Sequence, residues 1–296
     1  MSALDLNDAL AALPARPGLW RRLPRDGAVW ISGAVLVAIA LAALFAPWLA
    51  PYDPYETGQP PFIPPALMDG GMPQFLLGTD NQGRDLLSRL LFGTRSTLTI
   101  GVLATLLGGG TGVVLGMLAA YFAWASTAIM RLVDVMLSFP AILFGLAFAA
   151  VIGPGTTAVV IALSIAAVPD VARVTRSTAV VVMGQEYMEA GRAIGLSDGY
   201  LITHYLALNC LGPVFVFLTL RFGQVILISA ILSFLGLGAR PPYAELGMMA
   251  AQGRDALFFA PHIAMIPSLA IFIIVLCTNL LGDSLRDALD PRLRNT

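Results

Sequence analysis

The sequence predicts an all-α integral membrane protein with six transmembrane helices. Of its 296 residues, 57% are hydrophobic and only 12% are charged, whereas roughly a quarter of the residues in a soluble domain are charged. The mean hydropathy is +0.81, and several uncharged runs exceed the ~18 residues that indicate a spanning helix. This composition excludes a soluble globular protein.

The first expected span follows a polar tail, residues 1–26, that contains four arginines. The next charge-free run, residues 27–52, is longer than the apolar core of a signal peptide, so we expect it to be retained. We place its helix at residues 27–49. Arginines before a first span indicate that the N-terminus lies on the cytoplasmic side.

Residues 50–95 predict an exterior loop, because prolines, glycines and acids predominate as far as residue 74. Thr79 and Gln82 have the spacing of a helix capping box. After them, leucines on one side alternate with polar residues on the other: Leu86, Leu87, Leu90 and Leu91 against Arg84, Asp85, Ser88 and Arg89. We therefore expect a short amphipathic helix on the membrane surface at about residues 79–93.

The remaining five spans are expected within residues 96–284. The second, about residues 97–122, has four glycines at helical spacing, Gly101, Gly108, Gly112 and Gly116, which predicts close helix packing rather than a phosphate-binding loop. The uncharged run 135–169 would extend roughly 50 Å as one helix, too long for a ~30 Å hydrocarbon core. We expect it to turn back at residues 153–155.

That turn gives a third span near residues 135–152 and a fourth from residue 156 into the region 170–176. The fifth and sixth spans are expected near residues 211–235 and 261–281, and residues 285–296 form a tail. Six spans place both termini on one side of the membrane. Eleven of the seventeen arginines then lie on that side and five on the other, so the positive-inside rule predicts that both termini are cytoplasmic.

Several classes of chemistry are disfavoured. The chain has no lysine, and a Walker A loop needs one to hold phosphates, so we expect no ATP site of that kind. The segment GLSDG, residues 195–199, has the spacing of a hydrolase nucleophile elbow, but no strand precedes it. The expected topology separates His204 from His262, which disfavours a Ser/His pair or a histidine metal site.

Cys210 and Cys277 are expected to be buried free thiols. With a net charge of -1, the chain has no basic field for nucleic acid.

Charge inside the expected spans is sparse. None of them contains Asp or Glu, and ion-coupled carriers usually need an intramembrane carboxylate, so a stand-alone secondary carrier or channel is the less favoured alternative. Arg221 is the only intramembrane charge expected. Both a role in the transport pathway and a structural pairing remain open for it.

Residues 185–209 form the only long charged segment between spans. Glu186, Glu189 and Arg192 recur at helical spacing, and Gly195 with Ser197 predicts a break followed by a capped second helix. Such a helix could dock in a groove of a partner, or it could be an ordinary solvated loop helix. The pattern alone leaves both interpretations open.

The string EYMEAGRAIGLSDGYLITHYLALN, residues 186–209, resembles the EAA loop of ABC importer permease subunits, with Glu189, Ala190 and Gly195 matching its pattern. Gly191 replaces the usual second alanine, and Ala207 with Leu208 replaces the usual Leu and Pro. Four other strings resemble the dipeptide, oligopeptide and nickel class of these permeases: LLGTDNQGRDLLSRLLFGTRSTL, RLVDVMLSFPAIL, LSFLGLGARPPYAELGMM and NLLGDSLRDALDPRL.

The resemblance implies a type I ABC importer permease fold, called MetI-like, in the bacterial inner membrane. It also implies four partners: a second homologous permease of the dipeptide type, two ATP-binding subunits that hold ATP and Mg, and a periplasmic substrate-binding protein. The residues implied to contact the ATPase are Glu186, Glu189, Ala190, Gly191, Arg192 and Gly195. A segment PPALMDGG favours peptide as the substrate, with nickel, glutathione and opines as alternatives. No cofactor and no catalytic residue is implied for this chain itself.

Overall fold

The computed structural model describes residues 27–289, and every regular element in that part of the chain is helical. The predicted tail 1–26 and the last residues of the predicted tail 285–296 lie outside it. In chain order the helices are α2 (Gly27–Leu44), α3 (Ala46–Leu49), α4 (Leu86–Tyr121), α5 (Ala123–Leu137), α6 (Ala141–Ile152), α7 (Thr156–Met183), α8 (Glu186–Ala193), α9 (Asp198–Tyr200), a π-helical segment (Leu201–Leu206), α10 (Ala207–Phe234), α11 (Leu246–Gln252), a 3₁₀ turn (Arg254–Ala256) and α12 (His262–Leu289).

Four helical stretches of the described chain are long and apolar enough to cross a bilayer: α4, α7, the continuous stretch from α9 to α10, and α12. Helices α5 and α6 qualify only together, as a pair bent by 85°. Helix α2 is shorter, so the expected total of six spans stays a prediction. Large apolar side chains such as Leu106, Phe215 and Phe272 are exposed on these helices, as is normal for surfaces that face lipid.

The region of the expected third span, residues 135–152, is not one continuous helix. The chain instead breaks between α5 and α6, where Ser138 ends one helix and Pro140 precedes the next. Proline disfavours helical geometry at the residue before it and has no N–H to donate within a helix. A prediction from hydropathy misses this break, because one proline barely changes the mean hydropathy of a long apolar run.

The close packing predicted for the glycines of α4 is confirmed: Gly101 lies against Phe222 and Ile226 of α10, and the other three lie against α7. A methyl group built on Gly108 would lie 2.3 Å from the Ser164 carbonyl oxygen, and one on Gly116 would lie 2.5 Å from that of Ala172. At Gly112 the nearest atom, Cβ of Val171, would be 2.7 Å away. Only glycine permits this backbone approach, so the glycine face joins α4 to α7 along most of their length.

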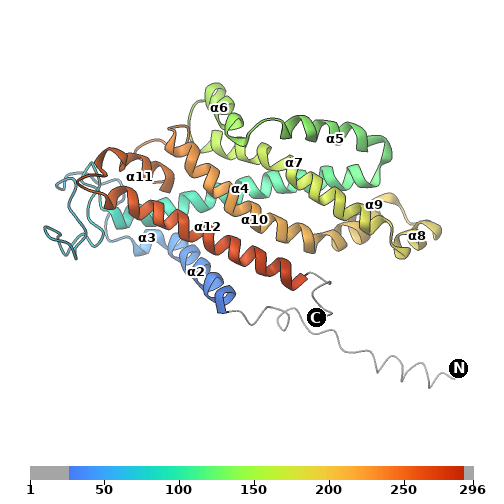
Figure 1. The fold of residues 1–296 in the computed structure, drawn as a ribbon, viewed down its shortest axis with the longest axis horizontal. Helices are drawn as coiled ribbons and strands as arrows, with labels where there is room; N and C mark the ends of the chain where they lie inside the picture. Colours follow the sequence, from blue (N-terminus) through green and yellow to red (C-terminus); the bar gives the residue numbers. More distant parts are fainter. Residues whose placement is uncertain (1–26, 290–296) are drawn as a thin grey trace, which may run out of the picture.

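The long helices lie side by side, and the two ends of the bundle differ (Figure 1). Residues 50–85 and α11 gather at one end, which we call the loop end, and α8 with α9 projects at the other. The chain enters α2 and leaves α12 on the side facing away from the loop end (Figure 1). The two ends of the bundle therefore differ in structure, as expected for a membrane protein whose two ends face different compartments.

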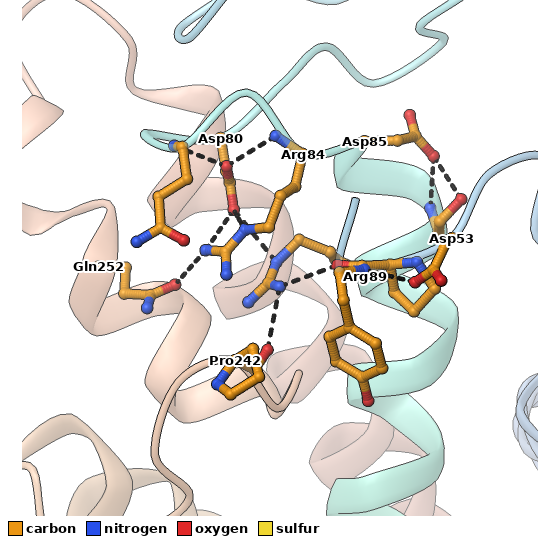
Figure 2. Close-up of polar contacts among 11 residues, drawn as sticks. Asp53, Asp80, Arg84, Asp85, Arg89, Pro242 and Gln252 are labelled. Atoms are coloured by element: carbon orange, nitrogen blue, oxygen red, sulfur yellow. Dashed lines mark hydrogen bonds and ion pairs between the residues drawn. The ribbon is translucent and has the colours of Figure 1, made fainter. Parts of the chain in front are cut away.

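The loop end is held together by a buried ionic cluster, drawn in Figure 2. Nη2 of Arg84 lies 2.7 Å from Oδ2 of Asp80, and Nε of Arg89 lies 3.2 Å from the same oxygen. Arg89 also donates to the carbonyl oxygens of Pro54 and Pro242. All three charged side chains are at most 2% exposed, so the cluster ties the loop, the start of α4 and the segment before α11 together.

The cluster overturns the expected capping box and surface helix. Asp85, not Thr79, caps α4 by accepting from the backbone N–H of Ser88 at 2.7 Å. Thr79 accepts from the N–H of Ile63 and donates to the carbonyl oxygen of Pro60. From Leu86 the helix continues without a break into the second span. The two-sided pattern was real, but its polar side faces the buried cluster rather than water.

Candidate functional site

Helix α8 presents one face to its own chain and the other to solvent. Glu186 and Glu189 occupy its first turn and Arg192 its last turn, which favours the helix because these charges oppose its dipole. Met188 and Gly191, three residues apart, are buried. Glu186, Glu189, Ala190 and Arg192 are exposed, so a short amphipathic helix forms where the pattern predicts it.

The end of α8 is fixed by a Schellman motif. The N–H of Leu196 donates to the carbonyl oxygen of Gly191 at 3.1 Å, and that of Gly195 donates to Arg192 at 3.0 Å. This pattern needs a left-handed residue, which is Gly195 with φ of 81°. Ser197 then caps α9 by accepting from the N–H of Tyr200. The predicted break and cap are confirmed, but the second helix is not short, because it continues through the π-helical segment and α10 to Phe234.

Gly191 has an internal role in this loop. A methyl group there would lie 2.8 Å from Cδ2 of Leu201 and 3.4 Å from Cδ1 of Leu196. The residue therefore lets α8 approach the π-helical segment that leads into α10, and it lies on the buried face. Of the six residues predicted to meet a partner, Gly191 is the one that this structure turns inward.

A chain of side-chain contacts fastens the loop to the end of α4. The guanidinium carbon of Arg192 lies 5.6 Å from the ring centroid of Tyr121, in range for a cation–π contact. The Tyr121 hydroxyl donates to Oδ1 of Asp198 at 2.5 Å. Tyr121 is the last residue of α4, and Asp198 begins the continuous helix that becomes α10. These contacts join α8 to the last residue of α4 and to the start of the helix that becomes α10.

Two exposed side chains near the acidic residues are not among the six residues predicted to meet a partner. Ile194 is 75% exposed and Tyr200 is 45% exposed, although both are large and apolar or aromatic. Ile194 lies four residues after Ala190 and eight after Glu186, so helical spacing alone places it on the exposed side of α8. We call Glu186, Glu189, Ala190 and Ile194 the α8 face.

Arg221 lies in α10, far along the chain from the α8 face, and forms an ion pair with Asp170 of α7. The expectation that no span contains a carboxylate is therefore wrong, because α7 continues past Asp170 to Met183. Charge at residues 170–176 suggested the end of a span, yet the helix extends through it. The structural pairing that was left open for Arg221 is present.

The loop presents a set of exposed polar side chains on α8. Ser197 serves as a helix cap. His204 stacks on Tyr200 near α9, whereas His262 is the first residue of α12 at the loop end, so the expected separation of the two histidines holds. Cys210 and Cys277 are free and buried, as predicted. A nucleophile–base pair is not assembled among these residues of the described chain.

Residues 112–295 match the family described as "Binding-protein-dependent transport system inner membrane component". Residues 18–65 match the N-terminal TM domain of oligopeptide transport permease C. The chain is 43% identical over 262 residues to the di/tripeptide transport system permease protein DppC of Pseudomonas aeruginosa (strain UCBPP-PA14), covering 88% of this chain and 86% of that protein. It is 40% identical over 277 residues to the glutathione transport system permease protein GsiD of Pectobacterium atrosepticum, covering 93% and 91%.

Solved structures share the fold. An inward-facing structure of the MetNI methionine ABC transporter superposes with a TM-score of 0.57 at 19% identity, covering 68% of this chain and 97% of that chain. A crystal structure of an amino acid ABC transporter with histidines gives a TM-score of 0.52, covering 67% and 92%. At this identity the likeness concerns the fold alone.

Proposed function

Because this chain belongs to the binding-protein-dependent transport system inner membrane components, we propose that it is the permease subunit of an ATP-driven peptide importer. It carries di- or oligopeptides across the bacterial inner membrane as a multi-pass protein. The names of the relatives DppC and GsiD support peptide as the substrate class. The absence of lysine supports ATP and Mg binding by other subunits, since a Walker A loop requires that residue.

The proposed topology has six spans, with α2 as the first and the bent pair α5 and α6 as the third. Both termini and α8 lie in the cytoplasm, and the loop end with α11 lies in the periplasm. The distribution of arginines supports this orientation. So does the projection of α8 from the bundle opposite the loop end (Figure 1).

The α8 face docks on an ATP-binding subunit, and this contact couples hydrolysis to transport. The observation that carries the proposal is the fastening of α8 to two long helices through Arg192, Tyr121 and Asp198. If the loop had no contacts with the spanning helices, it could move with the ATP-binding subunit without moving those helices. Here a displacement of α8 reaches α4 and α10 and can shift the bundle between inward-open and outward-open states.

The complete importer comprises this chain, a second homologous permease of the dipeptide type, two ATP-binding subunits and a periplasmic substrate-binding protein. The transport pathway lies between the two permeases. The binding protein meets the loop end from the periplasm. We propose no cofactor for this chain.

The test is co-purification of the permease with its ATP-binding subunits. Glu189→Lys reverses a charge on the α8 face and should abolish both association and ATP-dependent peptide uptake. Asp255→Lys makes the same change at the loop end, where Asp255 is also exposed, and should leave the association of the ATP-binding subunits unchanged. Normal association of Glu189→Lys would contradict the docking assignment.

A stand-alone carrier is the second candidate, because Asp170 supplies the intramembrane carboxylate that such carriers use. Vesicles depleted of ATP distinguish the two. Uptake should stop when ATP is removed and should require all subunits. Uptake that persists without ATP would favour the carrier.

A further inference from the structure

A cavity of about 140 Å³ lies where α5 bends into α6, and it contains the intramembrane charge pair. Its walls come from four helices, α5, α6, α7 and α10. Apolar and polar side chains share them, and those that the argument uses are Met136, Phe139, Phe144, Asp170, Arg221 and Gln224. Mostly apolar walls with a few convergent polar groups are the usual composition of a small-molecule site.

The charge pair is placed at the centre of the bundle and is open to this cavity. Asp170 and Arg221 lie near the midpoints of α7 and α10, each 28 residues long. Their side chains are 37% and 19% exposed. The ion pair of Asp80 and Arg84, which has a structural role, is 2% and 1% exposed. Charged side chains inside a membrane-spanning bundle are energetically costly, and those that stay accessible to a cavity usually mark a substrate path.

The pair retains unused hydrogen-bonding groups. The ion pair uses Nη2 of Arg221 and Oδ2 of Asp170, and Nη1 of Arg221 donates to Oε1 of Gln224. Nε of Arg221 is buried without a partner. Nη1 and Nη2 of Arg221 each keep a second N–H that can donate to an anionic ligand, and the side-chain amide of Gln224 offers two donors beside them.

We propose that Asp170, Arg221 and Gln224 form a transmembrane binding subsite for the charged ends of a zwitterionic peptide. Arg221 and Gln224 donate to the peptide carboxylate, and Asp170 accepts from its ammonium group. Met136, Phe139 and Phe144 contact the peptide side chains. This inference rests on the proposed function and names the part of this chain that meets its substrate.

The exchange of partners explains how a permease can bind its substrate and still release it. With peptide bound, both charges pair with the ligand. After release they pair with each other, so neither charge is left alone in an apolar region in either state. The cavity is smaller than the ~300 to 1,000 Å³ of complete ligand sites, so the second permease supplies the remaining wall.

The experiment measures access to the cavity in the assembled importer. Ala166 lines the cavity one helical turn before Asp170. The variant Ala166→Cys is made in a background with Cys210→Ala and Cys277→Ala, and its labelling by a small methanethiosulfonate reagent is followed. A dipeptide with free termini should slow the labelling. The same dipeptide with an acetylated amine and an amidated carboxylate should not, because it carries neither charge.

Single substitutions test which side chain binds which end of the peptide. Arg221→Gln and Asp170→Asn should each raise the peptide concentration needed for protection by about tenfold or more, the loss typical of one charge-assisted hydrogen bond. In the Arg221→Gln variant, a dipeptide with a C-terminal amide should protect as well as one with a free carboxylate. In the Asp170→Asn variant, a dipeptide with an acetylated amine should protect as well as one with a free amine. The exchanged pair, Asp170→Arg with Arg221→Asp, restores an ion pair and controls for a purely structural role.

The outcomes separate this inference from the proposed function. Selective protection by the free dipeptide, lost in the single variants while the importer still assembles, supports the subsite. If the importer takes up peptide with ATP but free and blocked dipeptides protect equally, or if the single variants keep the wild-type selectivity, the subsite is overturned while the proposed function stands. If the complete wild-type importer takes up no peptide, the proposed function fails, and the subsite fails with it.

Discussion

At the scale of single residues, Gly195 determines where α8 ends. Its φ of 81° is left-handed, and a side chain there costs roughly 1–2 kcal/mol. Gly195→Ala should therefore unwind the last turn of α8 and weaken association with the ATP-binding subunits, measured by co-purification. Gly199→Ala is the matched control, since both glycines face open space and only Gly195 has a left-handed φ. Equal effects of the two substitutions would refute the backbone explanation.

Asp80 is the residue on which the loop end depends, because two buried arginines share its carboxylate. Asp80→Asn leaves them without a counter-ion and should destabilise the protein by about 3–5 kcal/mol, the usual consequence of breaking a buried pair. Thermal unfolding of the detergent-solubilised protein measures this loss. Asp255→Asn, which breaks an exposed ion pair, should change the unfolding temperature little. An unchanged unfolding temperature for Asp80→Asn would show that the cluster is not needed.

At the scale of helices, the contact between α4 and α7 is set by glycine. Gly112→Leu would force a side chain against Val171 and the carbonyl oxygen of Val168, which should destabilise the bundle by at least 1–3 kcal/mol, roughly the cost of overpacking. The control lies on the same helix, since a methyl group on Gly110 would meet no atom within 4 Å. Gly110→Leu should leave the yield of folded protein in detergent unchanged. A stable Gly112→Leu protein would contradict the close packing.

The link between α8 and the spanning helices depends on one hydroxyl group. Tyr121→Phe keeps the aromatic ring near Arg192 and removes the bond to Asp198, at a cost of about 0.5–1.5 kcal/mol. We expect ATP hydrolysis to continue while fewer peptides enter per ATP, which proteoliposomes can measure. Tyr187→Phe removes a hydroxyl group from the same loop and spares this bond. An unaltered ratio of transport to hydrolysis in Tyr121→Phe would show that force does not pass this way.

At the scale of the whole molecule, composition and periodicity predicted the helical class, the glycine face and the two helices around Gly195. They could not predict which side of a two-sided helix faces water, so Arg84 and Arg89 were assigned to a membrane surface although they are buried. They also placed the end of a span at the charge of Asp170, where a distant arginine from α10 allows the helix to continue. The second error comes from a partner far apart in sequence, whereas Arg84 and Arg89 are buried with the nearby Asp80 because the loop folds over them.

For the candidate site, the sequence supplied Glu186, Glu189, Ala190, Arg192 and Gly195, all of them exposed. It could not supply the contact of Gly191 with Leu201 or the bond between Tyr121 and Asp198, because these depend on how the loop folds back on the bundle. The asymmetry of the bundle, with the loops and α11 at one end and a projecting α8 at the other (Figure 1), is consistent with the proposed coupled transport.

The most direct test of this account is a cross-link from the tip of α8. Ile194→Cys, in a background with Cys210→Ala and Cys277→Ala, is placed in the assembled importer and treated with a short thiol cross-linker. The account predicts an adduct with an ATP-binding subunit whose yield changes between nucleotide-free and ATP-bound states. An importer that transports peptide with ATP yet gives no such adduct in any nucleotide state would contradict it.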